Sequence, residues 1–252
     1  MYATLIAVAA LWGAATGLLV PRAAYRLAVE PEDGLRADCP AGHPITGPAG
    51  GWLGTARCAR CHAADGTPYA RSRLLPLLSA LSCAALAAAT GPHPALAVWL
   101  LLVPFCALLA RVDGAVRRLP DVLTLPLAAA TAALLGVVAL LPGGDGPGGG
   151  SWTTALLGGL ALGACYFVLH LINPGGLGFG DVKLALVLGV ALGWYGWGVL
   201  AGGAFAGFLL FSLYGSALML RRRTARGITL PFGPFMIAGT LLGLLAGGLT
   251  AR

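Results

Sequence analysis

Long apolar runs alternate with short charged or glycine- and proline-rich breaks along most of the 252-residue chain. A helix needs about 20 apolar residues to cross the hydrocarbon core of a bilayer, and several runs approach that length. The pattern predicts an all-α, polytopic membrane protein with about eight transmembrane helices. The expected spans are residues 2–20, 74–90, 95–110, 122–141, 152–172, 182–194, 197–220 and 235–250.

Charged and polar residues divide the chain into three parts. Residues 1–20 form the first expected helix, and residues 74–252 form a multi-helix membrane domain. Between them, residues 21–73 make a long polar loop that is the only candidate soluble module. This loop contains three of the six cysteines.

The basic residues predict the orientation of the spans. The first run has no basic segment before it and no small-residue cleavage site after it, whereas Arg22 and Arg26 follow it directly. We therefore expect a retained helix with its N-terminus outside. Alternating the spans from there places 15 of the 16 Lys and Arg residues in the cytoplasm and only Arg252 outside, as the positive-inside rule requires.

Composition supports a membrane environment. The chain is 58% hydrophobic and 10% charged, with a mean hydropathy of +0.85, so a soluble globule would lack polar surface. The net charge of +7 could suggest nucleic-acid binding, but most arginines flank apolar runs. We expect the lipid bilayer, and no nucleic acid, as a partner.

Two aspartates return to the same membrane boundary in this topology. Asp113 follows the third span, and Asp181 opens the sixth. Two close carboxylates do not easily both ionise, so one can hold a proton while the other acts as a base on water, as in an aspartic protease. A helix cap at Asp181 and an interfacial charge at Asp113 remain alternatives. Gly178 and Gly180 would let the backbone approach a substrate or adopt a positive φ just before the helix.

Three segments near the expected membrane boundaries carry distinctive motifs. Residues 178–184 read GFGDVKL, residues 113–126 read DGAVRRLPDVLTLP, and residues 228–239 read ITLPFGPFMIAG. They resemble, respectively, the GxGD signature, the first catalytic region and the closing segment of the type IV prepilin peptidase family, a group of GxGD aspartic proteases. The segments occur in the family's order, in a chain of about the family's size.

The resemblance implies an activity and a substrate. It implies an aspartic endopeptidase of the bacterial inner membrane, with Asp113 and Asp181 catalytic and Gly178, Gly180 and Lys183 supporting. It would cleave the leader of prepilins or pseudopilins after a glycine at the cytoplasmic face, with no cofactor for that step. Many members also methylate the new N-terminus with S-adenosylmethionine, but a 53-residue loop is too short for a Rossmann domain, and this second activity stays open.

Other polar residues near the spans have simpler interpretations. We assign Asp121, after Pro120, to helix capping. Lys183 could neutralise Asp181 or contact substrate, although topological anchoring is the commoner role. His170 is expected to hydrogen-bond to a neighbouring helix rather than relay protons. A basic run is read as a stop signal after the seventh span; it consists of Arg221, Arg222, Arg223 and Arg226.

The cysteine loop carries a candidate metal site. Family members often have two C-x-x-C pairs here, a spacing that suits tetrahedral zinc. Cys58 and Cys61 form one such pair, but the other begins at Cys39 and has Gly42 in place of its second cysteine. A zinc site that uses His43 as its fourth ligand and a loop without metal both remain open.

Two other functions are alternatives to the prepilin peptidase. One is a GxGD intramembrane protease with a different substrate, against which the LPDVLTLP segment and the cysteine loop argue. The other is a small transporter that couples the aspartates to ion movement. Two aspartates at a boundary, rather than at the membrane midplane, argue against transport.

Overall fold

The chain is built from helices in the computed structural model. The structure describes residues 2–30, 34–58, 60–61, 69–70, 72, 74–144, 150–221 and 230–251. Within these ranges the only strand-like pairing is an isolated bridge between Asp38 and Pro44. The predicted all-α class is confirmed.

Eight long helices of the described chain correspond one to one with the predicted spans. They are α1 (Tyr2–Leu27), α4 (Leu74–Thr90), α5 (Ala95–Val116), α6 (Asp121–Ala139), α7 (Trp152–Ile172), α8 (Phe179–Gly193), α9 (Trp197–Arg221) and α10 (Gly233–Thr250). Six are long and apolar enough to cross a membrane by themselves, whereas α4 has 17 residues and α8 has 15. A short turn, α2 (Pro48–Gly51), lies in the loop after α1. The chain is a multi-pass membrane protein.

Two helices continue beyond the predicted membrane boundary. α1 passes through Pro21 to Leu27, and α5 passes through Asp113 to Val116. The charged residues that mark the edge of the apolar run do not end the helix, because its backbone hydrogen bonds continue outside the lipid. Asp113 therefore lies on α5 and does not follow it, which corrects the predicted position.

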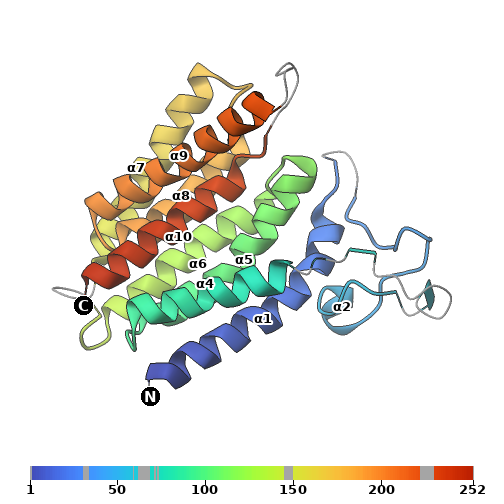
Figure 1. Cartoon of the computed structure of the whole chain (residues 1–252), viewed down its shortest axis with the longest axis horizontal. Coiled ribbons are helices and arrows are strands. Elements are labelled where there is room, and N and C mark those ends of the chain that lie inside the picture. Colours follow the sequence, from blue (N-terminus) through green and yellow to red (C-terminus); the bar gives the residue numbers. More distant parts are fainter. Residues whose placement is uncertain are drawn as a thin grey trace.

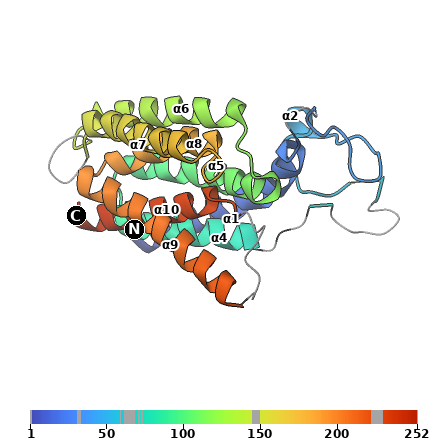
Figure 2. The same ribbon diagram turned by 90° about the horizontal axis from the view of Figure 1, so that it is seen from above.

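The helices pack in neighbouring pairs, with α1 along α4, α7 along α8 and α9 along α10. Figures 1 and 2 show both termini at one end of the bundle and the loop that carries α2 at the opposite end. α5 and α10 extend toward the end that carries this loop. The polar sites described below lie at that end.

The short helix α8 is enclosed by its neighbours α6, α7, α9 and α10. Most of its side chains are buried, including Val187, Leu188 and Leu192. Its closest approach is to α7, where glycines let the two backbones touch: a Cβ on Gly189 would lie 2.6 Å from the carbonyl oxygen of Gly158. Small residues at such crossings are typical of membrane helices. This contact fixes the position of the helix that begins beside Asp181.

We predict that Gly189→Ala lowers the thermal midpoint of the purified protein. The added methyl group would meet backbone, and overpacking of this kind costs about 1–3 kcal/mol. Gly202→Ala on α9 is the matched control, because its Cβ would meet nothing within 4 Å. Equal midpoints for the two variants would contradict the close α7–α8 contact.

Candidate active site

Asp113 lies in the last turn of α5 and is 5% exposed. Its Oδ2 accepts a hydrogen bond of 3.0 Å from the backbone N–H of Gly233, the first residue of α10. The N-terminus of a helix carries partial positive charge and free N–H groups, which favour a carboxylate there. The start of α10 thereby holds one candidate catalytic side chain.

The packing of Phe232 holds the start of α10 in place. Its ring contacts those of Tyr166, Phe208 and Phe211, with centroids 5.0–6.0 Å apart. Phe232 itself is 6% exposed. This aromatic cluster joins α7 and α9 to the start of α10. Its contacts fix the direction in which the N–H of Gly233 points.

Asp181 is the third residue of α8 and is 8% exposed. Its Oδ2 accepts a hydrogen bond of 3.0 Å from the N–H of Gly178, the N-cap residue. The capping alternative thus describes part of what Asp181 does. In both aspartates the backbone N–H group holds the Oδ2 atom, and a carboxylate has further acceptor sites with which to bind a water or a substrate.

One cavity of about 280 Å³ brings the two aspartates together. Residues 117–121 and the first turn of α8 form its other walls. Its lining residues are Asp113, Arg117, Arg118, Leu119, Asp121, Gly178, Phe179, Gly180, Asp181 and Lys183. The volume is close to the lower end of the range of small-ligand sites, and the walls are largely polar.

Arg117 shapes the turn between the two aspartate segments. It adopts a left-handed backbone conformation, with φ 53°, and its N–H donates to the carbonyl oxygen of Asp113 at 2.7 Å. This geometry ends α5 and redirects the chain toward α6. Leu119, 3% exposed, then packs beneath the start of α8.

The two glycines of the GxGD segment do not use a positive φ. Gly178 has φ −72°, and Gly180 is not among the left-handed residues of the described chain. A Cβ on Gly180 would instead lie 3.1 Å from the Cβ of Leu119. The expectation of a positive φ is therefore wrong, whereas the approach of this backbone to a substrate stays a prediction. The close packing of Gly180 on Leu119 brings α8 against the 117–121 turn.

Asp121 does not cap α6, which corrects its predicted role. Pro120 holds the N-cap position, and Asp121 forms an ion pair of 2.6 Å with the Nζ of Lys183. Lys183 also lies over the ring of Phe179, 4.7 Å from its centroid. Lys183 therefore pairs with Asp121 and not with Asp181, and this ion pair joins the starts of α6 and α8 across the cavity.

The remaining polar predictions have mixed outcomes. The Nδ1 of His170 lies 2.7 Å from the carbonyl oxygen of Leu177, which is in the α7–α8 loop and not on a neighbouring helix. Arg222, Arg223 and Arg226, and residues 228–229 of the closing segment, lie outside the described residues, as does the side chain of Arg221. The sequence predicts no role for Gly233, which lies in the closing segment. Its position directly before Pro234 is the signal that could have marked it as a helix start.

The four predicted metal ligands converge in the loop. The Sγ atoms of Cys39, Cys58 and Cys61 and the Nδ1 of His43 all lie within 4.8 Å of one another. The separations include 3.7 Å from Cys39 to Cys61, 3.2 Å from Cys61 to His43 and 3.7 Å from Cys58 to His43. Tetrahedral zinc bonds of usual length place ligand atoms about 3.3–3.8 Å apart. The cluster can hold a metal ion.

The cysteines of the pair differ in their protonation. A hydrogen bond from the backbone N–H of Cys61 lowers the pKa of the Cys58 thiol to about 6, whereas desolvation raises the pKa of Cys61 to about 11. Cys58 therefore offers a thiolate near neutral pH. Because a metal must displace the remaining thiol protons, metal binding should weaken as the pH falls.

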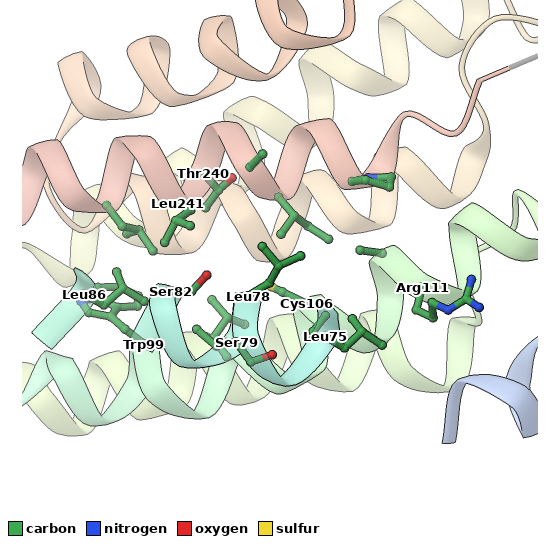
Figure 3. Close-up of a pocket in the computed structure, with 18 residues that line it drawn as sticks. Leu75, Leu78, Ser79, Ser82, Leu86, Trp99, Cys106, Arg111, Thr240 and Leu241 are labelled. Carbon is green, nitrogen blue, oxygen red and sulfur yellow. The ribbon is translucent and has the colours of Figure 1, made fainter. Parts of the chain in front are cut away.

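A second cavity, of about 340 Å³, lies between α4, α5 and α10 (Figure 3). Apolar side chains, among them Trp99 and several leucines, form most of its walls, and Arg111 lies at one end, two residues before Asp113. None of its lining residues carries a carboxylate. It has no group suited to acid–base chemistry, so the candidate chemistry stays in the cavity that contains the aspartates.

Comparisons with known proteins show the family to which the chain belongs. Residues 100–221, which include both aspartates, match the model of the type IV leader peptidase family. The prepilin leader peptidase/N-methyltransferase of Aeromonas salmonicida is 33% identical over 224 residues, covering 86% of this chain and 73% of that protein. The chain belongs to the type IV leader peptidase family. No solved structure matches it significantly.

Other relatives have the same description. The prepilin leader peptidase/N-methyltransferase of Pseudomonas aeruginosa is 32% identical over 201 residues, covering 78% of this chain and 64% of that protein. The Bacillus subtilis protein of that name is 40% identical over 97 residues, 38% of each chain. The resemblance to the family is confirmed, and two of the three segments, residues 113–126 and 178–184, lie within the matched residues. Membership of the leader peptidase family favours a protease over an ion-coupled transporter.

Proposed function

We propose that this leader peptidase removes the leader of prepilins or pseudopilins, with Asp113 and Asp181 as its catalytic pair. The observation that carries the proposal is the shared cavity of about 280 Å³, in which each carboxylate is buried and held by one backbone N–H. The relatives named as prepilin leader peptidases supply the substrate class.

The reaction needs one base, one acid and a water molecule. One carboxylate takes a proton from the water, whose oxygen attacks the scissile carbonyl carbon, while the protonated partner donates to the carbonyl oxygen. The tetrahedral intermediate then collapses, the C–N bond breaks, and the departing nitrogen receives the proton held by the base. The backbone N–H groups of Gly178 and Gly233 keep the two carboxylates in place during this exchange.

We place this chemistry at the cytoplasmic face of the bacterial inner membrane. The positive-inside rule assigns the basic loops to that side, and the aspartate cavity lies near such loops at Arg117 and Arg118. The chain termini lie at the opposite end of the bundle from the cysteine loop (Figure 1). This separation is consistent with an N-terminus outside and a loop inside.

We also propose that the Cys39, His43, Cys58 and Cys61 cluster binds one zinc ion, which holds the loop together. Three thiolates and one imidazole are a usual structural donor set, and His43 substitutes for the ligand missing at Gly42. S-adenosylmethionine would supply the methyl group for the second activity in the relatives' names. The described part of the loop has no sheet, so it lacks a Rossmann-type cradle, and methylation is not part of this proposal.

Replacing either catalytic aspartate should abolish leader cleavage. We expect Asp113→Ala and Asp181→Ala to reduce processing of a co-expressed prepilin from the same genome by at least about a hundredfold, because each removes an acid–base group. Asp121→Ala is the matched control, since an exposed ion pair contributes little to stability. Full processing by either catalytic variant, at equal protein levels, would refute the pair, and failure of Asp121→Ala would reassign the first carboxylate.

A methyl group at Gly233 should impair the same reaction without removing a carboxylate. Its Cβ would lie 2.8 Å from the Oδ2 of Asp113, so the side chain would have to move. We expect Gly233→Ala to lower the cleavage rate about tenfold or more, because misplaced catalytic groups lose rate steeply. Gly114→Ala, whose Cβ would meet nothing within 4 Å, should cleave at the wild-type rate. Equal rates for the two variants would contradict the positioning role of Gly233.

The zinc proposal predicts one zinc ion per chain by elemental analysis of the purified protein. Cys61→Ser and His43→Ala should each lose most of it, whereas Cys165→Ser, an exposed thiol on α7, should keep it. Retention should decline as the pH falls, because protons compete with zinc for the thiolates. A metal-free wild-type protein would favour the alternative of a loop held by packing alone.

A further inference from the structure

A third cavity lies in the cysteine loop and has a strongly basic lining. It has a volume of about 170 Å³, and Arg22, Arg57, Arg60 and Tyr69 contribute to its walls. No carboxylate is among the lining residues that the structure describes. The cavity therefore concentrates three positive charges beside Cys58, and none of its lining residues belongs to the aspartate cavity.

Arg22 is a buried cation without a carboxylate partner in the described chain. Its side chain is 6% exposed, and its two Nη atoms donate to the carbonyl oxygens of Leu53 and Thr46. The ion pair between Lys183 and Asp121 does not involve Arg22. A buried charge is normally paired, so carbonyl oxygens alone leave this one uncompensated.

Two buried hydrogen-bond donors at the cavity are also without partners. Neither the Nε of Arg22 nor the hydroxyl of Tyr69 makes a hydrogen bond within the described ranges. Burial raises the pKa of Tyr69, so its hydroxyl stays protonated and available as a donor. Native proteins leave few buried donors unsatisfied, and here two line the same small space.

The loop is built closely around Arg22. Gly54 has φ 138°, and a Cβ at that position would overlap the Nη1 of Arg22. The ring of Tyr69 packs on that of Tyr25, with centroids 4.9 Å apart. Both unpartnered donors therefore have fixed positions before any ligand arrives, which lowers the entropic cost of binding.

We propose that this cavity binds an oxyanion, a carboxylate or a phosphate group, between the guanidinium groups of Arg22, Arg57 and Arg60 and the hydroxyl of Tyr69. Planar guanidinium groups match the geometry of both oxyanions. The ligand would supply the acceptor oxygens and the negative charge that the protein itself does not provide. The site goes beyond leader cleavage, because it shares no residue with the aspartate cavity.

The test measures binding of inorganic phosphate to the purified full-length protein from broadening of the phosphate ³¹P resonance, at constant ionic strength. Arg57→Gln and Tyr69→Phe should each weaken binding about tenfold, as expected for loss of one donor to a charged group. Arg22 is avoided because it also holds the loop. Arg36→Gln is the matched control: Arg36 is exposed in the same loop but stacks on Tyr25 outside the cavity.

The outcomes are distinct. Equal weakening by Arg57→Gln and Arg36→Gln would show that phosphate senses only net charge and would overturn the site. Parallel titrations identify the source of the oxyanion. S-adenosylhomocysteine supplies a carboxylate, and phosphatidylglycerol nanodiscs, compared with phosphatidylcholine nanodiscs, supply a lipid phosphate. The natural ligand is the one whose binding is tightest and is weakened by Arg57→Gln. The site would also be overturned if the Arg57→Gln variant bound every probe as tightly as the wild-type protein does. Leader cleavage by Arg57→Gln should match wild type, so this test and that of the catalytic pair fail separately.

Discussion

The hydrogen bond from Gly233 to Asp113 joins residues that are 120 positions apart, and the geometry of the aspartate cavity depends on it. It requires α5 to extend past its apolar run, α10 to begin at the right height, and Phe232 to be fixed by its aromatic neighbours. A helix N-terminus suits this purpose because its N–H groups have no partners within the helix. The other helices of the bundle hold the N-termini of α8 and α10 against the end of α5 and the 117–121 turn.

Much of this arrangement could be predicted from the chain. Apolar runs located all eight long helices, and α4 and α7 have the predicted bounds. The predicted helix ends were wrong where a charged residue was taken as the end of a helix, as at Asp113. Leaving the lipid does not interrupt backbone hydrogen bonding. Asp121 was misread for a related reason. A preference for aspartate at helix starts says nothing about a lysine 62 positions away that comes within 2.6 Å.

The cysteine loop shows how a local pattern can be incomplete and its three-dimensional site still be complete. Gly42 interrupts the first cysteine pair, yet the next residue supplies an imidazole nitrogen at ligand distance. Residue spacing alone could not decide this, since the loop closes through long-range contacts: Arg26 donates to Gly50 and lies 4.2 Å from the ring centroid of Trp52. These anchors come from the part of α1 that extends beyond the predicted span. The same extension places Arg22 beneath the loop.

The shortness of α8 has a consequence for solvent. Fifteen helical residues rise about 22 Å, less than the roughly 30 Å of hydrocarbon in a typical bilayer, whereas the 25 residues of α9 rise about 37 Å. A helix that is too short can be accommodated only because other helices, not lipid, surround it. Asp181, near its beginning, is likewise enclosed by protein and is 8% exposed. Water therefore reaches the carboxylates through the cavity of about 280 Å³ that the two aspartates share, so the size of that cavity limits how many water molecules can stand beside the scissile bond.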